Sequence, residues 1–146
     1  MARVVCPGRR SNALIDPESA AHQFLRQATA TLEEARVLLA RDHPSGAINR
    51  AYYAAFYAAC ALLDSVGLKA RSHQAVITLL HREFVHYGRL DRDLMREYSA
   101  LLEDRMSGDY GPFSAATSER ARGGFDTATR FLDAVKTRLS AGADNG

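Results

Sequence analysis

The feature that most limits the fold is the segment AINRAYYAAFYAACALLDSV, residues 47–66, which is apolar almost all the way round a helix. A helix of this kind is normally buried on several sides by other elements. Its many alanines allow neighbouring helices to approach closely, and Gly67 is well placed to end it. The segment therefore predicts a central helix that other helices surround.

Four further helices are predicted from apolar residues that recur three and four positions apart. The first begins near Asp16, which can cap it, and Pro17 suits its first turn, and it ends near residue 41. The next two have Ser72 and Asp91 as expected caps, and the first of them is predicted as one helix over residues 72–87, which Gly88 ends. The last begins at Ser118 and carries the apolar stripe Ala121, Phe125, Ala128, Leu132, Val135 and Leu139.

The rest of the chain adds no other class of structure. No segment alternates in the manner of a strand, and neither a repeat nor a second domain is indicated. We therefore expect one all-α domain over residues 16–140, a bundle of four to five helices. Residues 1–15 are expected to form a flexible polar arm, and residues 141–146 a frayed tail.

Composition and charge give only broad limits on function. The chain has 19 basic and 17 acidic residues, a net charge of +2, and a local basic patch matters more for nucleic-acid binding than this sum. Two cysteines, Cys6 and Cys60, are too few for a disulfide framework and fit a reducing cytoplasm. No apolar run approaches the roughly 18 to 20 residues of a membrane span, so we expect a cytoplasmic protein without membrane contact.

An arginine interrupts the apolar stripe of the fourth helix. Arg105 lies eleven residues after Leu94, which returns it to nearly the same helix face. A guanidinium on the core side is costly unless it is paired or kept at a wet cleft. Arg105 is therefore either a structural side chain whose methylenes cover the core edge, or an anion site, because arginine grips phosphate in a bidentate manner. Asp109 and Tyr110 follow shortly after it.

The central helix offers polar partners for such a site. Asn49 and Tyr53 share one stripe of that helix, and Arg50 lies beside it. Two further tyrosines, Tyr52 and Tyr57, add to an unusual density of hydrogen-bonding groups, although some of these rings are expected to serve the core. Asn49, Arg50 and Tyr53 are thus candidate ligand-binding residues.

The histidines give no metal site. His73 starts the third helix on its apolar face, where it is either a structural histidine with satisfied hydrogen bonds or a side chain that lines the cleft near the central helix. His81 and His86 lack ligand partners at a convincing helical spacing. We therefore predict neither a metal nor a cofactor, and we place His73 among the candidate ligand-binding residues.

Three segments, residues 47–73, 83–94 and 105–113, resemble the HEPN superfamily, the all-α domains named for higher eukaryotes and prokaryotes nucleotide-binding. Their order and spacing resemble the small stand-alone prokaryotic members over about residues 20 to 140. The resemblance implies an up-and-down four-helix bundle with an additional short helix, and a homodimer. Many members are toxins of toxin–antitoxin or other defence systems and act as metal-independent endoribonucleases, often with a minimal nucleotidyltransferase antitoxin as partner.

The ribonuclease motif of this family is an arginine followed, after four to six residues, by a histidine. Arg105 matches the arginine, but Tyr110 stands where the histidine could be, and the last histidine of the chain is His86. A tyrosine, with an ordinary pKa of about 10, is a poor base near neutral pH but can donate a hydrogen bond.

Two interpretations follow from the resemblance. In the first, the chain binds RNA or a nucleotide: Arg105 holds a phosphate, Asp109 orients it and Tyr110 donates a hydrogen bond, and any catalysis is RNA cleavage without a metal. In the alternative, the chain is a non-catalytic interaction module that dimerises and binds a nucleotidyltransferase.

Overall fold

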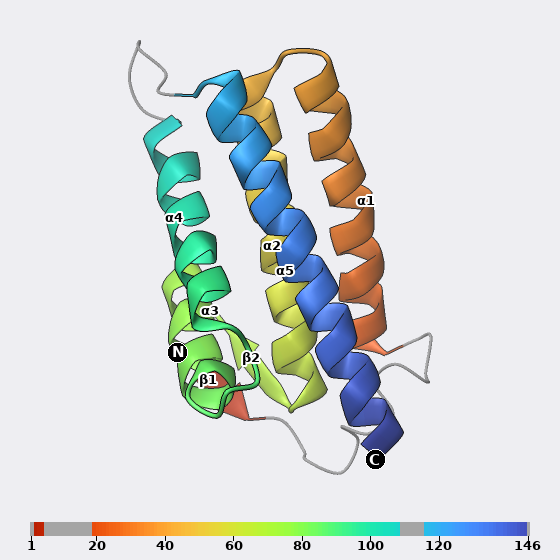
Figure 1. The fold of residues 1–146 in the computed structure, drawn as a ribbon. Helices are drawn as coiled ribbons and strands as arrows, with labels where there is room; N and C mark the ends of the chain where they lie inside the picture. The colour runs from red at the N-terminus through yellow and green to blue at the C-terminus, as the bar shows by residue number, and fades with distance from the viewer. Residues whose placement is uncertain (1, 5–18, 109–115, 146) are drawn as a thin grey trace.

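The protein is almost entirely helical over the residues that its computed structural model describes, 2–4, 19–108 and 116–145 (Figure 1). The described part forms five α-helices and one π-helical turn, which confirms the predicted all-α class. The elements are α1 (Ala20–Ala40), α2 (Pro44–Ser65), α3 (His73–Leu80), the π-turn η2 (His81–Val85), α4 (Arg92–Gly108) and α5 (Ser118–Asn145).

The starts of the first two helices differ from the sequence prediction. α1 begins at Ala20 because Ser19 is its cap, and the Ser19 hydroxyl accepts a hydrogen bond from the backbone N–H of His22 at 3.1 Å. Asp16 and Pro17, which we expected there, lie outside the described residues. α2 begins at Pro44, three residues earlier than expected, since proline suits the first turn of a helix.

The later helix starts confirm the prediction. The Ser72 hydroxyl accepts a hydrogen bond from the N–H of Ala75 at 3.0 Å, and the Asp91 carboxylate accepts one from the N–H of Leu94 at 3.1 Å. α5 begins at Ser118. It continues to Asn145, through most of the residues for which we expected a frayed tail.

α2 is the central helix, as its apolar surface predicted. It contacts α1, α3, α4 and α5, and Figure 1 shows it behind α5 with α1 and α4 on either side. Seven of its alanines are fully buried, which allows the backbones of neighbouring helices to lie close. They are Ala47, Ala51, Ala54, Ala55, Ala58, Ala59 and Ala61.

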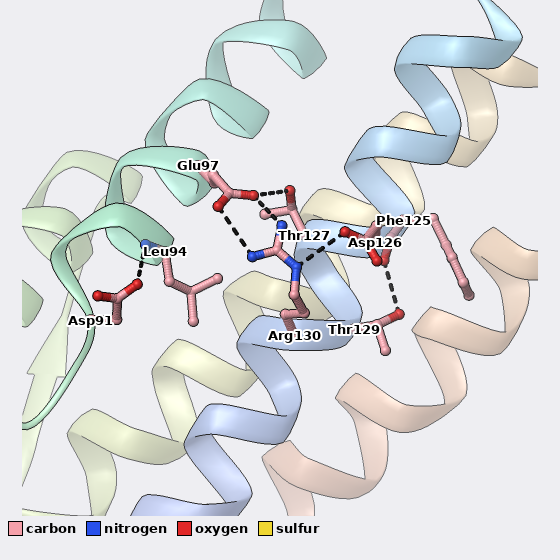
Figure 2. A network of polar contacts seen from close by, with 8 residues as sticks. All are labelled: Asp91, Leu94, Glu97, Phe125, Asp126, Thr127, Thr129 and Arg130. Carbon is pink, nitrogen blue, oxygen red and sulfur yellow. Dashed lines mark hydrogen bonds and ion pairs between the residues drawn. The ribbon is translucent and has the colours of Figure 1, made fainter.

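The packing of α4 on α5 combines close contact with a polar network (Figure 2). A Cβ atom at Gly124 would lie 2.9 Å from Cδ1 of Leu101, so the glycine permits the close approach of the two helices. At the surface, the Glu97 carboxylate of α4 accepts hydrogen bonds from the Thr127 hydroxyl and from the Arg130 guanidinium of α5. Arg130 also pairs with Asp126 at 3.0 Å.

A short antiparallel ladder was not predicted. β1 (Ala2–Val4) pairs with β2 (Leu68–Ala70), with Ala2 opposite Ala70. Strands of three residues are too short for alternation to be visible in a sequence. Residues 2–4 were expected within the polar arm, and the other residues of that arm lie outside the described part. None of the described helices is both long and apolar enough to cross a membrane.

Candidate functional site

One face of α2 remains half-exposed between Ala47 and Leu63, although the other residues of this stretch are buried. Its members recur at helical spacing, which places them on a single stripe. They are Asn49, Arg50, Tyr53, Phe56, Tyr57 and Cys60. The candidate residues of the central helix therefore lie together where a ligand can reach them.

Arg105 lies against this stripe from the last turns of α4. Leu94, Leu101 and Leu102 of the same helix are buried, and Arg105 is half-buried, as its position on the apolar stripe predicted. Its guanidinium carbon lies 5.0 Å from the centre of the Tyr53 ring and 5.8 Å from the centre of the Tyr52 ring. A guanidinium this close to an aromatic ring is attracted by the electrons of the ring.

A second guanidinium lies against the same tyrosine. The carbon of the Arg50 guanidinium is 5.2 Å from the centre of the Tyr53 ring. The Asn49 side-chain oxygen accepts hydrogen bonds from Nε and Nη2 of Arg50 at 3.2 and 2.9 Å, and Glu34 of α1 pairs with Arg50 at 3.5 Å. These contacts hold the Arg50 guanidinium in a defined position beside Tyr53.

His73 completes the cluster from the first turn of α3. Its Nδ1 atom lies 2.6 Å from the Tyr52 hydroxyl, and its ring packs against Phe56 at 4.8 Å between ring centres. Tyr52 is fully buried, and burial raises its pKa to about 12, so its hydroxyl stays protonated near neutral pH. Burial, and then the positive charge of Arg105, lower the pKa of His73. Both effects favour a neutral imidazole at pH 7.

The structure thus brings together five of the seven residues that the sequence suggested: Asn49, Arg50, Tyr53, His73 and Arg105. We call them, with Tyr52, the Arg105 cluster. Asp109 and Tyr110 lie outside the described residues, and the roles suggested for them stay predictions.

Sequence reasoning did not identify the residues behind the cluster. Tyr52 was noted only as one of several tyrosines, but its hydroxyl is the partner of His73. Tyr98 is fully buried next to it, with 5.8 Å between the ring centres. The sequence placed Tyr98 on the apolar stripe of the fourth helix, seven residues before Arg105, but it did not predict the contact of Tyr98 with Tyr52.

The Arg105 cluster suits an anionic ligand that also carries an aromatic ring. Two guanidiniums can each give paired hydrogen bonds to phosphate oxygens. Half-exposed aromatic side chains offer a surface for stacking a base. Among the described residues, no group of three histidine, cysteine, aspartate or glutamate side chains is placed to hold a metal ion.

Comparisons with known proteins agree with this architecture. The family model of the HEPN domain matches residues 21–138. A "UPF0332 protein" of Thermotoga maritima is 34% identical over 121 residues, which cover 83% of this chain and 92% of that protein. The protein named "Putative toxin MJ0605" of Methanocaldococcus jannaschii is 30% identical over 112 residues, 77% of this chain and 83% of that one.

Proposed function

Because the chain belongs to the HEPN domain family, we propose that it is an RNA- or nucleotide-binding protein of a prokaryotic toxin–antitoxin or defence module. The observation that carries the proposal is the pair of guanidiniums, from Arg50 and Arg105, on the one half-exposed ring of Tyr53. The name of the Methanocaldococcus relative, which contains the word toxin, supports the biological setting.

The cluster favours a phosphate because its donors are held in place before a ligand arrives. Arg50 is fixed by Asn49 and Glu34, and Arg105 by the rings of Tyr52 and Tyr53. Donors that are already oriented lose little side-chain entropy when they bind. Two positive charges around one ring also repel each other, and a phosphate between them relieves that repulsion.

The same cluster supports the finer proposal of RNA cleavage without a metal. Such cleavage needs a base that removes the proton of the ribose 2′-hydroxyl, a donor that stabilises the charge on the phosphate, and an acid that protonates the leaving 5′-oxygen, a role for which the sequence offers Tyr110. Arg105 can supply the donor. Although no histidine follows Arg105 in the sequence, His73 lies in the same cluster with a lowered pKa, which favours the neutral form that a base requires.

A second candidate function is a non-catalytic module that forms a homodimer and binds a minimal nucleotidyltransferase antitoxin. The absence of a motif histidine after Arg105 favours it. The half-exposed aromatic side chains of α2, Tyr53, Phe56 and Tyr57, also have the character of an interface core. Light scattering of the purified chain measures its dimerisation, and co-expression with a nucleotidyltransferase from the adjacent reading frame tests its partner.

Two measurements on one set of variants test the main proposal. Fluorescence anisotropy measures binding of a labelled single-stranded RNA, and gel analysis measures its degradation in the presence of a chelator. The wild type is compared with Arg105→Gln and with Arg122→Gln, which removes the same charge from an exposed position of α5. We expect Arg105→Gln to lose most RNA affinity and Arg122→Gln to lose little. Equal binding by all three proteins refutes the assignment of Arg105, and equal degradation refutes its role in cleavage.

A further inference from the structure

A second polar surface lies at the other end of α3, away from the Arg105 cluster. The chain widens there into the π-turn η2, in which the N–H of His86 bonds to the carbonyl of His81 at 2.9 Å. Gly88 then adopts a φ of +69°, a left-handed conformation that glycine tolerates best. π-turns of this kind occur often at functional positions.

The segment after η2 exposes the ring of Tyr87, which has polar groups on two sides. Tyr87 is 63% exposed, although most large apolar side chains of the chain are buried. The guanidinium carbon of Arg89 lies 5.3 Å from the centre of its ring, and the ring of His86 stands nearly edge-on to it at 4.9 Å. The phenol ring is therefore held in place yet remains open to solvent.

An open hollow of about 890 Å³ adjoins the ring. Its lining includes His81, His86, Tyr87 and Arg92, and also Gln74, the residue after His73. α3 thus connects the Arg105 cluster, at its first residue, to this hollow.

The acidic residues near the hollow are engaged by other groups. Glu83 pairs with Arg82 at 2.8 Å, and Asp93 pairs with Arg96 at 3.0 Å. Arg89 and Arg92 form no ion pair with the residues that the structure describes. Asp91, between these two arginines in the sequence, accepts a hydrogen bond from the N–H of Leu94 and offsets one of their charges, and the positive charge that remains beside Tyr87 favours a polyanion over an acidic or neutral surface.

We propose that Tyr87, Arg89 and Arg92, with the hollow lined by His81 and His86, form a second contact surface for single-stranded RNA. A base stacks on the Tyr87 ring, and Arg89 and Arg92 contact phosphates on either side of that base. This inference rests on the proposed function, because the same strand is held at its other end by the Arg105 cluster.

The length of α4 sets the length of RNA that reaches both surfaces. Arg92 and Arg105 are thirteen residues apart on one helix, a backbone distance of about 20 Å at ~1.5 Å per residue. Nucleotides in a stacked strand are spaced by ~3.4 Å, so roughly six nucleotides are the minimum that spans this distance. A trinucleotide can occupy the Arg105 cluster alone, whereas a dodecanucleotide can occupy both surfaces.

Binding of oligoadenylates of three and twelve nucleotides separates the two surfaces. Tyr87→Ala is expected to lower the affinity for the dodecanucleotide about tenfold, the typical effect of losing one stacked base, and to leave the trinucleotide unchanged. The double variant Arg89→Gln, Arg92→Gln tests the proposed phosphate contacts through the affinity for the dodecanucleotide, independently of the Tyr87 ring. Arg105→Gln is expected to weaken both oligonucleotides, and Arg122→Gln neither. Because Tyr87 is exposed, its removal leaves the core intact, which a thermal melt verifies.

Three outcomes overturn the inference, and only the last of them also overturns the proposed function. An unchanged affinity of Tyr87→Ala for the dodecanucleotide, with Arg105→Gln still defective, removes the second surface and leaves the proposed function standing. An equal loss for both oligonucleotides means that Tyr87 does not form a separate surface. If the wild type binds neither oligonucleotide, RNA binding by this chain is refuted as a whole.

Discussion

Replacement of Tyr53 by leucine removes the ring that both guanidiniums contact. Leucine keeps an apolar side chain at this half-exposed position, so the variant loses two cation–π contacts, at 5.0 and 5.2 Å, together with the contacts of the Tyr53 ring with neighbouring aromatic rings. Each cation–π contact at a partly exposed site stabilises by about 0.5–1 kcal/mol, so the two contacts account for about 1–2 kcal/mol of the loss in the free energy of unfolding. Tyr53→Phe keeps the ring and is expected to stay within about 0.5 kcal/mol of the wild type.

Urea unfolding followed by circular dichroism measures these differences as shifts of the midpoint at constant slope. Tyr57→Leu is the matched control, because Tyr57 lies on the same half-exposed stripe and no guanidinium of the described residues lies over its ring. The loss in Tyr53→Leu beyond the loss in Tyr57→Leu contains the two cation–π contacts and the contacts of the Tyr53 ring with Tyr52 and His73. Equal losses in the two leucine variants, or an equal loss in Tyr53→Phe, would show that the ring does not hold the guanidiniums.

Three further predictions test other parts of the structure. The pKa of His73 in the folded state is lowered from its ordinary 6.5, so the free energy of unfolding should fall as the pH drops through about 6.5 toward that lower value. Urea titrations over this pH range should show a smaller fall in the free energy of unfolding for His73→Gln than for the wild type. Gly123→Ala should stabilise the protein by about 1 kcal/mol, because a Cβ atom at Gly123 meets open space. Gly124→Ala should be about 1–3 kcal/mol less stable than Gly123→Ala, because its Cβ atom meets the buried Leu101 side chain at 2.9 Å. Thermal melts that show equal stability of the two variants would contradict the close helix contact. Burial raises the pKa of Cys60 to about 12, so in a Cys6→Ser variant a disulfide reagent at pH 8 should label the native chain far more slowly than the urea-unfolded chain.

The sequence was informative wherever one helical period governs the structure. The apolar surface of residues 47–66 predicted that α2 is central, and the position of Arg105 on the stripe of α4 predicted that it faces the other helices. The caps Ser72 and Asp91 were also predictable, since a side-chain oxygen at the cap accepts a hydrogen bond from the backbone N–H three residues later.

Other features depend on contacts between distant residues and were not visible in the sequence. The partnership of Tyr52 with His73 joins residues 21 positions apart on different helices. The two guanidiniums on Tyr53 come from α2 and α4, and only the packing of those helices brings them together. The π-turn after α3 has no sequence period of its own, so residues 72–87 were predicted as one continuous helix.

The salt dependence of RNA affinity tests most directly whether Arg50 and Arg105 hold phosphates. For single strands, the slope of log K against log salt concentration is about −0.7 for each phosphate neutralised. The slope should therefore become shallower by about 0.7 in Arg105→Gln and by about 1.4 when Arg50→Gln is added, with Arg122→Gln unchanged. Identical slopes in the wild type and the double variant would contradict phosphate binding by the two guanidiniums at Tyr53.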